Sequence, residues 1–411
     1  DAWNFDTWSL REVDQVAAFE KLAKSGTCIL DAVPAYGKTE VIAALANWYA
    51  DIVAGTLGEP FPVLIPIDRG LLFDQTLSRL RERLPWLKIG EVSASVFEPQ
   101  EVTVAMTQTL MKRVKSGCPD TTRLIKNTKA LIVDEVHRAT SDETYKFMLS
   151  IPAKVRLGLS GTPTRKKDRL RNMRLCGMIG PIVHKETYER QRELKHISGM
   201  VCCLFEYKHE TGLGSLAGEN YDLFYKIHIQ GNSDRNSIIC RKAMLLKNNR
   251  KVQTVVYVER TQHGITLQYQ FVAEYGEYVP LIHGQLKKSD SQELMRGILT
   301  GETPLAICTG VFNTGMNAPR LKGLVIASAG DSSDVGLPQL QGRGIRQNPD
   351  RFDQDFCLVD IQDVGIASLE RQAKARRAFY SSYPNATVYV DSDGPLIRPD
   401  NSVLSSLRAT V

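Results

Sequence analysis

Gly37, Lys38 and Thr39 stand at the joint between a short apolar run and an amphipathic stretch, in ILDAVPAYGKTEVIAALANWYA at residues 29–50. A strand, a turn and a helix in this order would point backbone N–H groups and the positive end of a helix dipole at one place, which favours an anion. The lysine would add charge for a phosphate, and the threonine a hydroxyl for magnesium. Because the pattern begins with Ala32 where glycine is usual, a turn without a ligand stays open as the alternative.

Two carboxylates, Asp134 and Glu135, follow the apolar run KALIV at residues 129–133. A buried strand would place both at the carboxyl edge of a parallel sheet, where ligands of open α/β sheets bind. In phosphoryl transfer to water, one carboxylate holds magnesium and another orients or deprotonates the attacking water. An acidic pair is also common in a solvated turn, so its chemical meaning depends on the phosphate loop.

A third group, Q-x-x-G-R-x-x-R, is formed by Gln339, Gly342, Arg343 and Arg346. On a helix the two arginines would share one face, which by itself could be an ordinary basic face. If the first half of the chain binds a nucleotide, these arginines could neutralise the charge that grows on the γ-phosphate, as arginine fingers do. Hydrolysis would then depend on the closure of two domains.

The elements that would position these groups are short β-branched runs separated by helical stretches. Strands are predicted at residues 27–32, 61–67, 102–106, 129–135, 155–161, 253–258, 278–283, 305–310, 323–328 and 356–361. Strands that alternate with helices predict two α/β domains with parallel sheets. We assign residues 1–197 and 198–390 to these domains and 391–411 to a tail. The Gly-rich polar stretch at about 205–235 is expected to be the linker, and a helix at 368–383 with a strand at 387–390 closes the second domain.

The composition of the 411 residues, 43% hydrophobic and 24% charged, is that of a folded globular chain. The net charge of +6 permits a polyanionic partner without requiring one. No apolar run approaches the ~20 residues of a membrane span, and DAWNFDTWSL lacks the regions of a signal peptide, so we expect a cytoplasmic protein with no membrane contact. The chain lacks an initiating Met, which leaves room for residues before Asp1. The eight cysteines are expected to be buried free thiols, and the histidine spacing indicates no zinc site.

Segments across about residues 10–350 resemble, in order, the motif series of the superfamily 2 helicases: DQVAAF, AVPAYGKT, VLIPIDRGLLFDQT, VAMTQTL, DEVH, GLSGTPTR, VVYVERTQHGITL, LIHG, ICTGVFNTGMNAP and QLQGRGIR. The DEVH form and the pairing of the last two segments are most similar to the phage UvsW and RecG-type branch-migration helicases. The resemblance implies an α/β fold with two RecA-like parallel-sheet domains in tandem and an ATP cleft between them. It also implies ATP hydrolysis with Mg²⁺, coupled to movement along single-stranded, forked or branched DNA. We expect the protein to act as a monomer in the cytoplasm, or in the host cytoplasm if the chain is viral.

The same resemblance assigns roles to individual residues. Those implied in catalysis are Lys38, Glu135, Gln339, Arg343 and Arg346. Those implied in ATP binding are Gln15, Ala35, Tyr36, Gly37, Lys38, Thr39, Gly315 and Asn317, with Thr39 and Asp134 as magnesium ligands. Those implied in coupling nucleotide state to domain movement are His137, Ser160 and Thr162. Those implied in contacts to nucleic-acid phosphates are Arg69, Gln75, Thr107, Gln108, His283, Gly284 and Thr309.

Two positions depart from the family pattern. Gln15 lies one residue further from Arg11 than is usual, and Asn317 replaces an aspartate that many relatives carry, which removes a charge near the ribose. We expect Lys38 to be exposed in its loop, Tyr36 either to stack on a ligand or to pack, and the basic cluster at 165–174 to be a solvated helix face that could supply a surface control at Arg171.

Three other functions stay open at this stage. The chain could be the duplex-translocating subunit of a restriction or remodelling complex, or an RNA helicase, because backbone contacts do not reveal whether 2′-hydroxyls are read. An ATP-gated clamp that acts by binding alone is a third hypothesis. Intact Lys38, Glu135 and Arg343 argue against the clamp, because binding alone needs no hydrolytic water.

Overall fold

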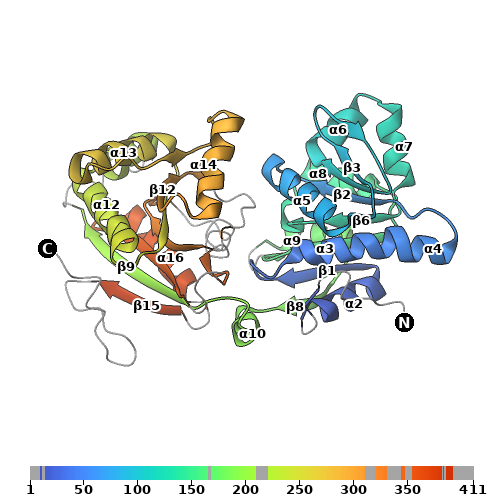
Figure 1. Ribbon diagram of the computed structural model, residues 1–411, viewed down its shortest axis with the longest axis horizontal. Coiled ribbons are helices and arrows are strands. Elements are labelled where there is room, and N and C mark those ends of the chain that lie inside the picture. The colour runs from blue at the N-terminus through green and yellow to red at the C-terminus, as the bar shows by residue number, and fades with distance from the viewer. Residues whose placement is uncertain are drawn as a thin grey trace. The chain divides into compact units, whose positions relative to one another are not determined.

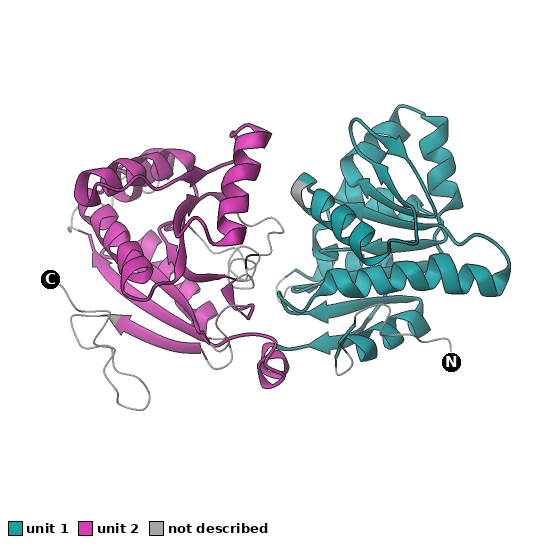
Figure 2. Ribbon diagram, in the orientation of Figure 1, with its two compact units in different colours: residues 1–187 teal, residues 188–411 magenta. Residues whose placement is uncertain are grey.

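The computed structural model describes residues 10–11, 14–164, 168–209, 221–310, 318, 320–330, 344–347, 354–381, 383 and 386–391. The chain forms two compact units, Asp1–Thr187 and Tyr188–Val411 (Figure 2). Each unit has its own sheet and its own hydrophobic core.

The described part of the first unit builds an eight-stranded sheet in the order β4-β3-β5-β2-β6-β7-β1-β8. Its strands are β1 Thr27–Ala32, β2 Val63–Ile67, β3 Ile89–Val92, β4 Phe97–Glu98, β5 Val102–Met106, β6 Ala130–Val133, β7 Val155–Ser160 and β8 Ile182–Glu186. Neighbouring strands are parallel except for β3 and β4, which pair antiparallel. The carboxyl ends of the parallel strands therefore meet at one edge.

Helices cover both faces of this sheet (Figure 1). They are α2 Gln15–Ser25, α3 Lys38–Asn47, which continues through a π-helical turn Trp48–Val53 into α4 Ala54–Leu57, α5 Gly70–Arg83, α6 Thr107–Lys115, α7 Pro119–Asn127, a 3₁₀ turn Val136–Arg138, α8 Asp142–Ser150 and α9 Arg169–Met178. Because side chains alternate along a strand, Leu30 packs with α2, α3 and α5, whereas Ile29 packs with α6, α8 and α9.

The described part of the second unit builds a seven-stranded sheet in the order β11-β12-β10-β13-β14-β9-β15. Its strands, all paired in parallel, are β9 Met200–Lys208, β10 Gln253–Tyr257, β11 Leu281–Ile282, β12 Leu305–Cys308, β13 Leu321–Ile326, β14 Phe356–Val364 and β15 Ala386–Asp391. Since β9 already belongs to this sheet, the linker that we predicted at about 205–235 is wrong, and the chain divides before Tyr188.

The helices of the second unit are α10 Tyr188–Glu193, α11 Tyr221–Tyr225 with a π-helical turn Lys226–Gln230, α12 Ser233–Asn248, α13 Thr261–Tyr275, α14 Lys288–Thr300 and α16 Ala367–Ser381. Ile239 and Ala243 of α12 and Phe271 of α13 pack with Val256 of β10 in one core. On the sheet, α12 lies against β10 and β13, and α16 lies against β14 (Figure 1).

A buried ion pair joins α12 to the sheet of the second unit. Arg235 donates from Nε and Nη2 to the two carboxylate oxygens of Asp363 at 2.7 and 3.0 Å, and from Nη1 to the carbonyl of Ala327 at 2.8 Å. His209 Nε2 lies 2.9 Å from the same carboxylate. Arg235, Asp363 and His209 are all at most 3% exposed, so this charged group is part of the core.

The predicted α/β class with two parallel sheets is confirmed, with β4 as an antiparallel addition. The strands that we did not predict, β3, β4, β8 and β9, lie toward the outer parts of the two sheets. Cys176 is exposed, so the prediction that all cysteines are buried is wrong there. None of the helices in the described part of the chain has both the length and the apolar character that a membrane crossing requires.

Candidate active site

The loop between β1 and α3 has two residues with positive φ, a backbone conformation that few residue types adopt. Gly37, the residue that caps α3, has a φ of 88°, and Ala35 has a φ of 71°. A Cβ at Gly37 would lie 2.6 Å from Nε2 of Gln15, so both conformation and space call for glycine. The chain thereby turns sharply at the end of β1 and presents Lys38 and Thr39 in the first turn of α3.

Lys38 points back across the loop toward the acidic pair. Its Nζ donates to the carbonyl of Ala32 at 3.4 Å and lies 3.6 Å from Oε1 of Glu135. The Lys38 side chain is only 11% exposed, so the expectation that it is exposed is wrong. The cause is that the predicted phosphate-binding lysine and the predicted catalytic carboxylate meet in space.

Asp134 and Glu135 leave the end of β6 in a strained turn. Glu135 has a φ of 46°, in the left-handed region, and its N–H donates to Oδ1 of Asp134 at 2.8 Å. Burial and the neighbouring Glu135 charge raise the pKa of Asp134. Burial alone would also raise the pKa of Glu135, but Lys38 and His137 lower it below its ordinary value. Lys38 and His137 therefore favour the ionised form of Glu135.

The three residues predicted to couple nucleotide state to movement form a chain of contacts from this carboxylate. Nδ1 of His137 lies 3.2 Å from Oε2 of Glu135 and 2.7 Å from Oγ of Ser160. Because an ionised carboxylate can only accept, the short contact to Glu135 places a proton on Nδ1. Ser160 Oγ in turn accepts from the N–H of Thr162 at 3.1 Å. Residues from the ends of β6 and β7 are thus joined to the phosphate loop.

The oxygen donors at this edge suit magnesium. Thr39 supplies a hydroxyl and Asp134 a carboxylate, the hard ligands that Mg²⁺ takes when substrate phosphates and water complete its shell. The raised pKa of Asp134 indicates an excess of negative charge, which a divalent cation would relieve. Among the described residues, no cluster of three or more His, Cys, Asp or Glu side chains could hold a metal ion by itself.

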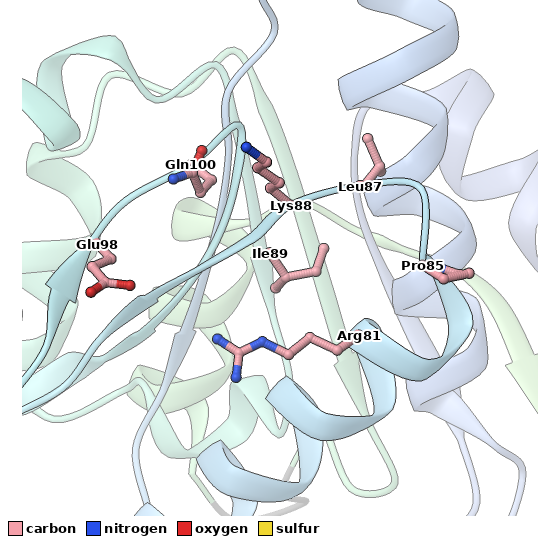
Figure 3. A pocket seen from close by; sticks show the side chains of 7 residues that line it. All are labelled: Arg81, Pro85, Leu87, Lys88, Ile89, Glu98 and Gln100. Atoms are coloured by element: carbon pink, nitrogen blue, oxygen red, sulfur yellow. The ribbon is translucent and has the colours of Figure 1, made fainter.

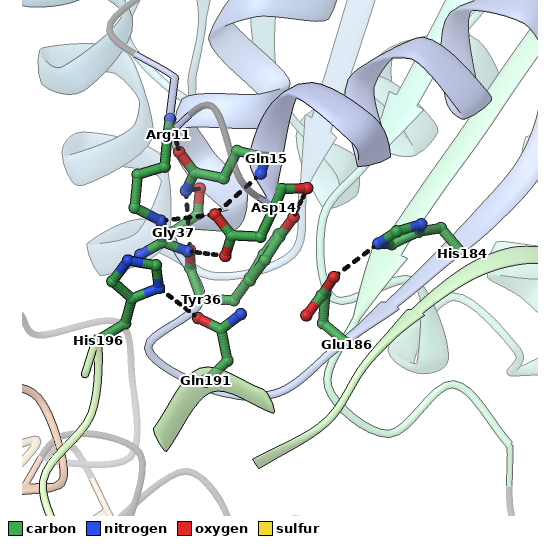
Figure 4. A network of polar contacts seen from close by, with 9 residues as sticks. All are labelled: Arg11, Asp14, Gln15, Tyr36, Gly37, His184, Glu186, Gln191 and His196. Atoms are coloured by element: carbon green, nitrogen blue, oxygen red, sulfur yellow. Dashed lines mark hydrogen bonds and ion pairs between the residues drawn. The ribbon is translucent and has the colours of Figure 1, made fainter. Parts of the chain in front are cut away.

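Gln15, predicted to read adenine, is turned toward the phosphate loop (Figure 4). Its Nε2 donates to the carbonyl of Tyr36 at 2.8 Å, and its Oε1 accepts from the N–H of Arg11 at 3.0 Å. Arg11 also donates to the Tyr36 carbonyl at 2.7 Å and pairs with Asp14 at 2.6 Å. The Tyr36 ring is fully buried and its hydroxyl donates to the carbonyl of Asp14 at 3.0 Å. Of the two roles considered for Tyr36, the structure therefore supports packing.

Arg171 is a functional candidate that our sequence analysis assigned to the surface. It is 8% exposed, and its Nη2 and Nε donate to the carbonyl of His137 at 2.8 and 3.2 Å. The solvated-face prediction for 165–174 is wrong at this position, although Arg169 is exposed; residues 165–167 lie outside the described part. Arg171 shares the buried stripe of α9 with Leu175 and Met178, at i+4 and i+7, and this spacing could have revealed it.

We expect Arg171→Met to lower both stability and turnover because it leaves the buried carbonyl of His137 without these donors. Loss of a buried, charge-assisted hydrogen bond costs about 1.5–3 kcal/mol, and displacement of His137 should lower the ATPase kcat by roughly tenfold. Arg169→Met on the same helix is the matched control. Thermal unfolding and kcat measured for both would contradict this role of Arg171 if the two variants behave alike.

The residues of the first unit that we predicted to contact nucleic acid lie mainly where neighbouring β-strands end. Arg69 follows β2, and Thr107 and Gln108 begin α6 directly after β5, which pairs with β2. Gln108 is exposed and Gln75 of α5 half-buried, but Thr107 is only 3% exposed. Burial and the nearby charge of Arg138 lower the pKa of Arg69, so a second cation that we did not predict lies near this edge.

In the second unit, His283 and Gly284 follow β11, and Thr309 follows the adjacent β12. His283 is half-buried, Gly284 is exposed and Thr309 is 6% exposed, with its N–H donating to the carbonyl of Ile282 at 3.0 Å. Arg346 is half-buried, and burial lowers its pKa to about 10, so it stays charged at neutral pH. Gly315, Asn317, Gln339 and Arg343 lie outside the described residues.

A separate open pocket of about 460 Å³ lies at the opposite end of the first sheet (Figure 3). Lys88 and Ile89 stand where β3 begins, and Arg81 comes from the last turn of α5. The other lining residues are Pro85, Leu87, Glu98 and Gln100. None of the predicted site residues is among the residues that line this pocket.

Comparison with known proteins identifies the family. Residues 10–165 match the family described as "Type III restriction enzyme, res subunit", and residues 235–348 match the "Helicase conserved C-terminal domain". The chain belongs to the superfamily 2 helicases. The resemblance seen in its motifs is thereby confirmed at the level of the superfamily, whose members are ATP-hydrolysing enzymes.

This helicase is similar in sequence to proteins of phage and archaeal origin. It is 24% identical over 394 residues to "Probable helicase D10" of Escherichia phage T5, across 91% of this chain and 75% of that protein. It is 21% identical over 283 residues to "DNA 3'-5' translocase XPB2" of Sulfurisphaera tokodaii, across 60% of this chain and 61% of that protein. The match thus spans about three fifths of the archaeal relative.

Two solved structures show the same fold as this helicase. The DNA-bound "ATP-dependent Type ISP restriction-modification enzyme LlaBIII" has a TM-score of 0.67 at 15% identity, across 94% of this chain and 32% of that chain. "S. cerevisiae Dbp5 bound to RNA and ADP BeF3" has a TM-score of 0.64 at 14% identity, across 95% and 96%. The predicted RecA-like architecture of the two sheets is therefore confirmed.

Proposed function

We propose that this helicase hydrolyses ATP in the presence of Mg²⁺ and uses the cycle to move along DNA and to remodel or unwind duplex or branched DNA. The observation that carries this proposal is the line of contacts from Lys38 through Glu135 and His137 to Ser160. It joins a phosphate loop to a hydrolytic carboxylate and then to the end of the next strand, which is what a motor needs and a simple ATP-binding site does not.

The residues at this edge of the first sheet have defined tasks in the proposed reaction. Lys38 holds the β- and γ-phosphates, and Thr39 with Asp134 would hold Mg²⁺, which supplies charge neutralisation when it is bound. Glu135 orients the attacking water and accepts its proton as the water oxygen bonds to the γ-phosphorus, and the bond from the γ-phosphorus to the bridging oxygen breaks so that ADP leaves. His137 holds Glu135 in place through its contact of 3.2 Å.

The second unit would complete the reaction. By family resemblance, Arg346 approaches the γ-phosphate together with the catalytic residues outside the described part, Gln339 and Arg343, while Gly315 and Asn317 lie near the ribose. Arginines that approach only when the domains close make hydrolysis depend on closure. A cycle of closing and opening is then the step that moves the protein along a strand.

The DNA path would follow the strand ends of both units. Arg69, Gln75 and Gln108 of the first unit and His283, Gly284 and Thr309 of the second are suited to phosphates, which position a strand without reading its sequence. Thr107 is buried, so we assign its contact to its backbone at the start of α6. The archaeal relative is named a DNA translocase and LlaBIII was solved on DNA, and we extend DNA to this chain, with forked or branched DNA preferred. We further propose that the chain acts as a monomer in the cytoplasm, or in the host cytoplasm if it is viral.

A translocating subunit of a restriction complex is the second candidate, because the first unit matches a restriction-enzyme subunit family. Such a subunit would move on duplex DNA without separating its strands. A clamp that acts by binding alone is disfavoured because Lys38 and His137 hold Glu135 charged, and only hydrolysis needs that carboxylate.

The test is the ATPase rate with single-stranded DNA, plain duplex, forked DNA, a four-way junction and RNA, all at one salt concentration. We expect branched DNA to stimulate most, and binding to weaken steeply between 50 and 200 mM salt, by roughly 10³ or more if six or more phosphates are contacted. Greatest stimulation by plain duplex without strand separation would favour the restriction-type translocase. Greater stimulation by RNA than by any DNA would overturn the DNA assignment.

A further inference from the structure

Lys322 is a buried cation in the centre of the second sheet. It is the second residue of β13, which lies between β10 and β14, and it is 0% exposed. Its neighbours in the strand, Leu321 and Gly323, are buried as well. Charged side chains are almost never fully buried unless they are paired, so this lysine needs an explanation that the packing of β13 does not supply.

The Lys322 ammonium donates hydrogen bonds to three oxygen atoms. Nζ donates to Oγ of Ser198 at 3.0 Å, to the carbonyl of Gly344 at 2.9 Å and to the carbonyl of Arg346. A lysine has three N–H donors, so these acceptors account for all of them. Burial lowers the pKa of Lys322 to about 8, against an opposing effect of Asp355. At neutral pH the group therefore still carries its full set of donors.

The segment 344–346 is held from a second side by the start of the second unit. The N–H and Oγ of Ser198 both donate to the carbonyl of Ile345, at 2.7 and 3.1 Å. Ile197 forms an isolated antiparallel bridge with Arg346. The three consecutive carbonyls of Gly344, Ile345 and Arg346 are thus all occupied by Lys322 or Ser198.

A third contact removes the remaining freedom of this segment. A Cβ at Gly344 would lie 1.9 Å from Cε2 of Phe356, which is fully buried in β14. The backbone at Gly344 therefore packs directly on the aromatic ring. Hydrogen bonds on three carbonyls and close packing at one Cα therefore restrain the backbone from Gly344 to Arg346.

We propose that Lys322 is a positioning residue for Arg346: through the carbonyls of Gly344 and Arg346, with Ser198 as its partner, it sets the backbone from which the Arg346 guanidinium reaches the γ-phosphate. The proposal rests on the finger role given to Arg346 under the proposed function. Preorganisation of this kind acts on the transition state, because a displacement of about 1 Å in a catalytic group can cost roughly 10²-fold in rate. It has little effect on binding of the ground state.

Lys322→Met tests this because methionine is also unbranched and apolar along its stem, is one atom shorter, and has no hydrogen-bond donor. In the full chain with saturating DNA, we expect the ATPase kcat to fall at least tenfold while the Kd for the non-hydrolysable analogue AMP-PNP changes by less than roughly threefold. Combined with Arg346→Ala, it should cost no further turnover, since both changes act through one group. A role in stability alone would give independent losses instead. Lys374→Met, an exposed lysine of α16, is the matched control.

Ser198→Ala is the milder second variant, and it decides the matter if Lys322→Met does not fold. It removes one acceptor of Lys322 and one donor to Ile345, and we expect kcat to fall roughly three- to tenfold with unchanged AMP-PNP binding. If Arg346→Ala lowers turnover but the Lys322 and Ser198 variants turn over at the control level, the positioning role of Lys322 is refuted and the finger role of Arg346 stands. Full turnover in Arg346→Ala would overturn the finger role, and the inference with it.

Discussion

Glu135→Gln is expected to lower ATP turnover by roughly two decades or more while ATP binding is kept, the scale of lost general-base catalysis. Glutamine has the shape of the carboxylate but cannot take the proton of the attacking water. In the wild type, Lys38 and His137 hold Glu135 ionised at 3.6 and 3.2 Å, so the base is charged before ATP arrives. The variant keeps Thr39 and Asp134, and therefore the proposed magnesium ligands.

Glu143→Gln is the control for this variant, since Glu143 is 64% exposed on α8 and pairs with the surface residue Lys115. The measurements are single-turnover hydrolysis with saturating DNA and equilibrium binding of ATP with Mg²⁺. Wild-type hydrolysis by Glu135→Gln would remove Glu135 from the reaction and refute the assignment of the acidic pair. Loss of ATP binding along with hydrolysis would instead make Glu135 a binding residue through Lys38.

Asp363→Asn is expected to lower the free energy of unfolding of the second unit by about 3–5 kcal/mol, the cost of removing one partner of a buried ion pair. Arg235 would stay in the core, 0% exposed, facing a neutral amide that cannot accept both of its N–H donors. Asp222→Asn is the matched control. Asp222 pairs with Arg260 at the same 2.7 Å distance, but its side chain is 83% exposed, and such surface pairs contribute about 0–1 kcal/mol.

The same prediction has a pH dependence with a definite sign. Burial would raise the pKa of Asp363, but Arg235 and His209 lower it to about 2, below the ~3.9 of an unfolded aspartate. Its stabilising contribution is therefore complete above about pH 4 and is lost as the pH falls through about 2. The stability difference between wild type and Asp363→Asn should stay constant from pH 7 to 5 and shrink between about pH 4 and 2.

The probe for this experiment has to report on the second unit. All four tryptophans, Trp3, Trp8, Trp48 and Trp86, belong to the first unit, so their fluorescence does not. Hydrogen exchange at the amides of β13 and β14 in the full chain measures the relevant free energy. A difference between the two variants of less than about 1 kcal/mol would contradict the structural role given to the Arg235 and Asp363 pair.

Local sequence determined the parts of this protein that depend on neighbours in the chain. Alternating β-branched runs and helical stretches were enough to locate most strands of both sheets, because side-chain periodicity is a property of a short segment. Asp134 and Glu135 could be placed at a strand end, and Lys38 at the start of a helix, for the same reason, and the order of the motifs identified the superfamily. The outer strands β3, β4, β8 and β9 were missed. β8 and β9 pair with strands about 150 residues or more away in the chain, whereas β3 and β4 are very short and pair with each other in a local antiparallel turn.

The tertiary structure decided which of these side chains are covered and what they touch. Lys38 is covered because Glu135, almost a hundred residues later, lies across the loop from it. Arg171 is buried because it lies on the face of α9 that contacts the carbonyl of His137. Gln15 donates to the carbonyl of Tyr36. Lys322 donates to the carbonyls of Gly344 and Arg346, which lie more than twenty residues later in the chain but next to it in the fold. A hydrogen bond or a buried charge depends on a partner's position in three dimensions, and local propensity and periodicity carry no information about that position.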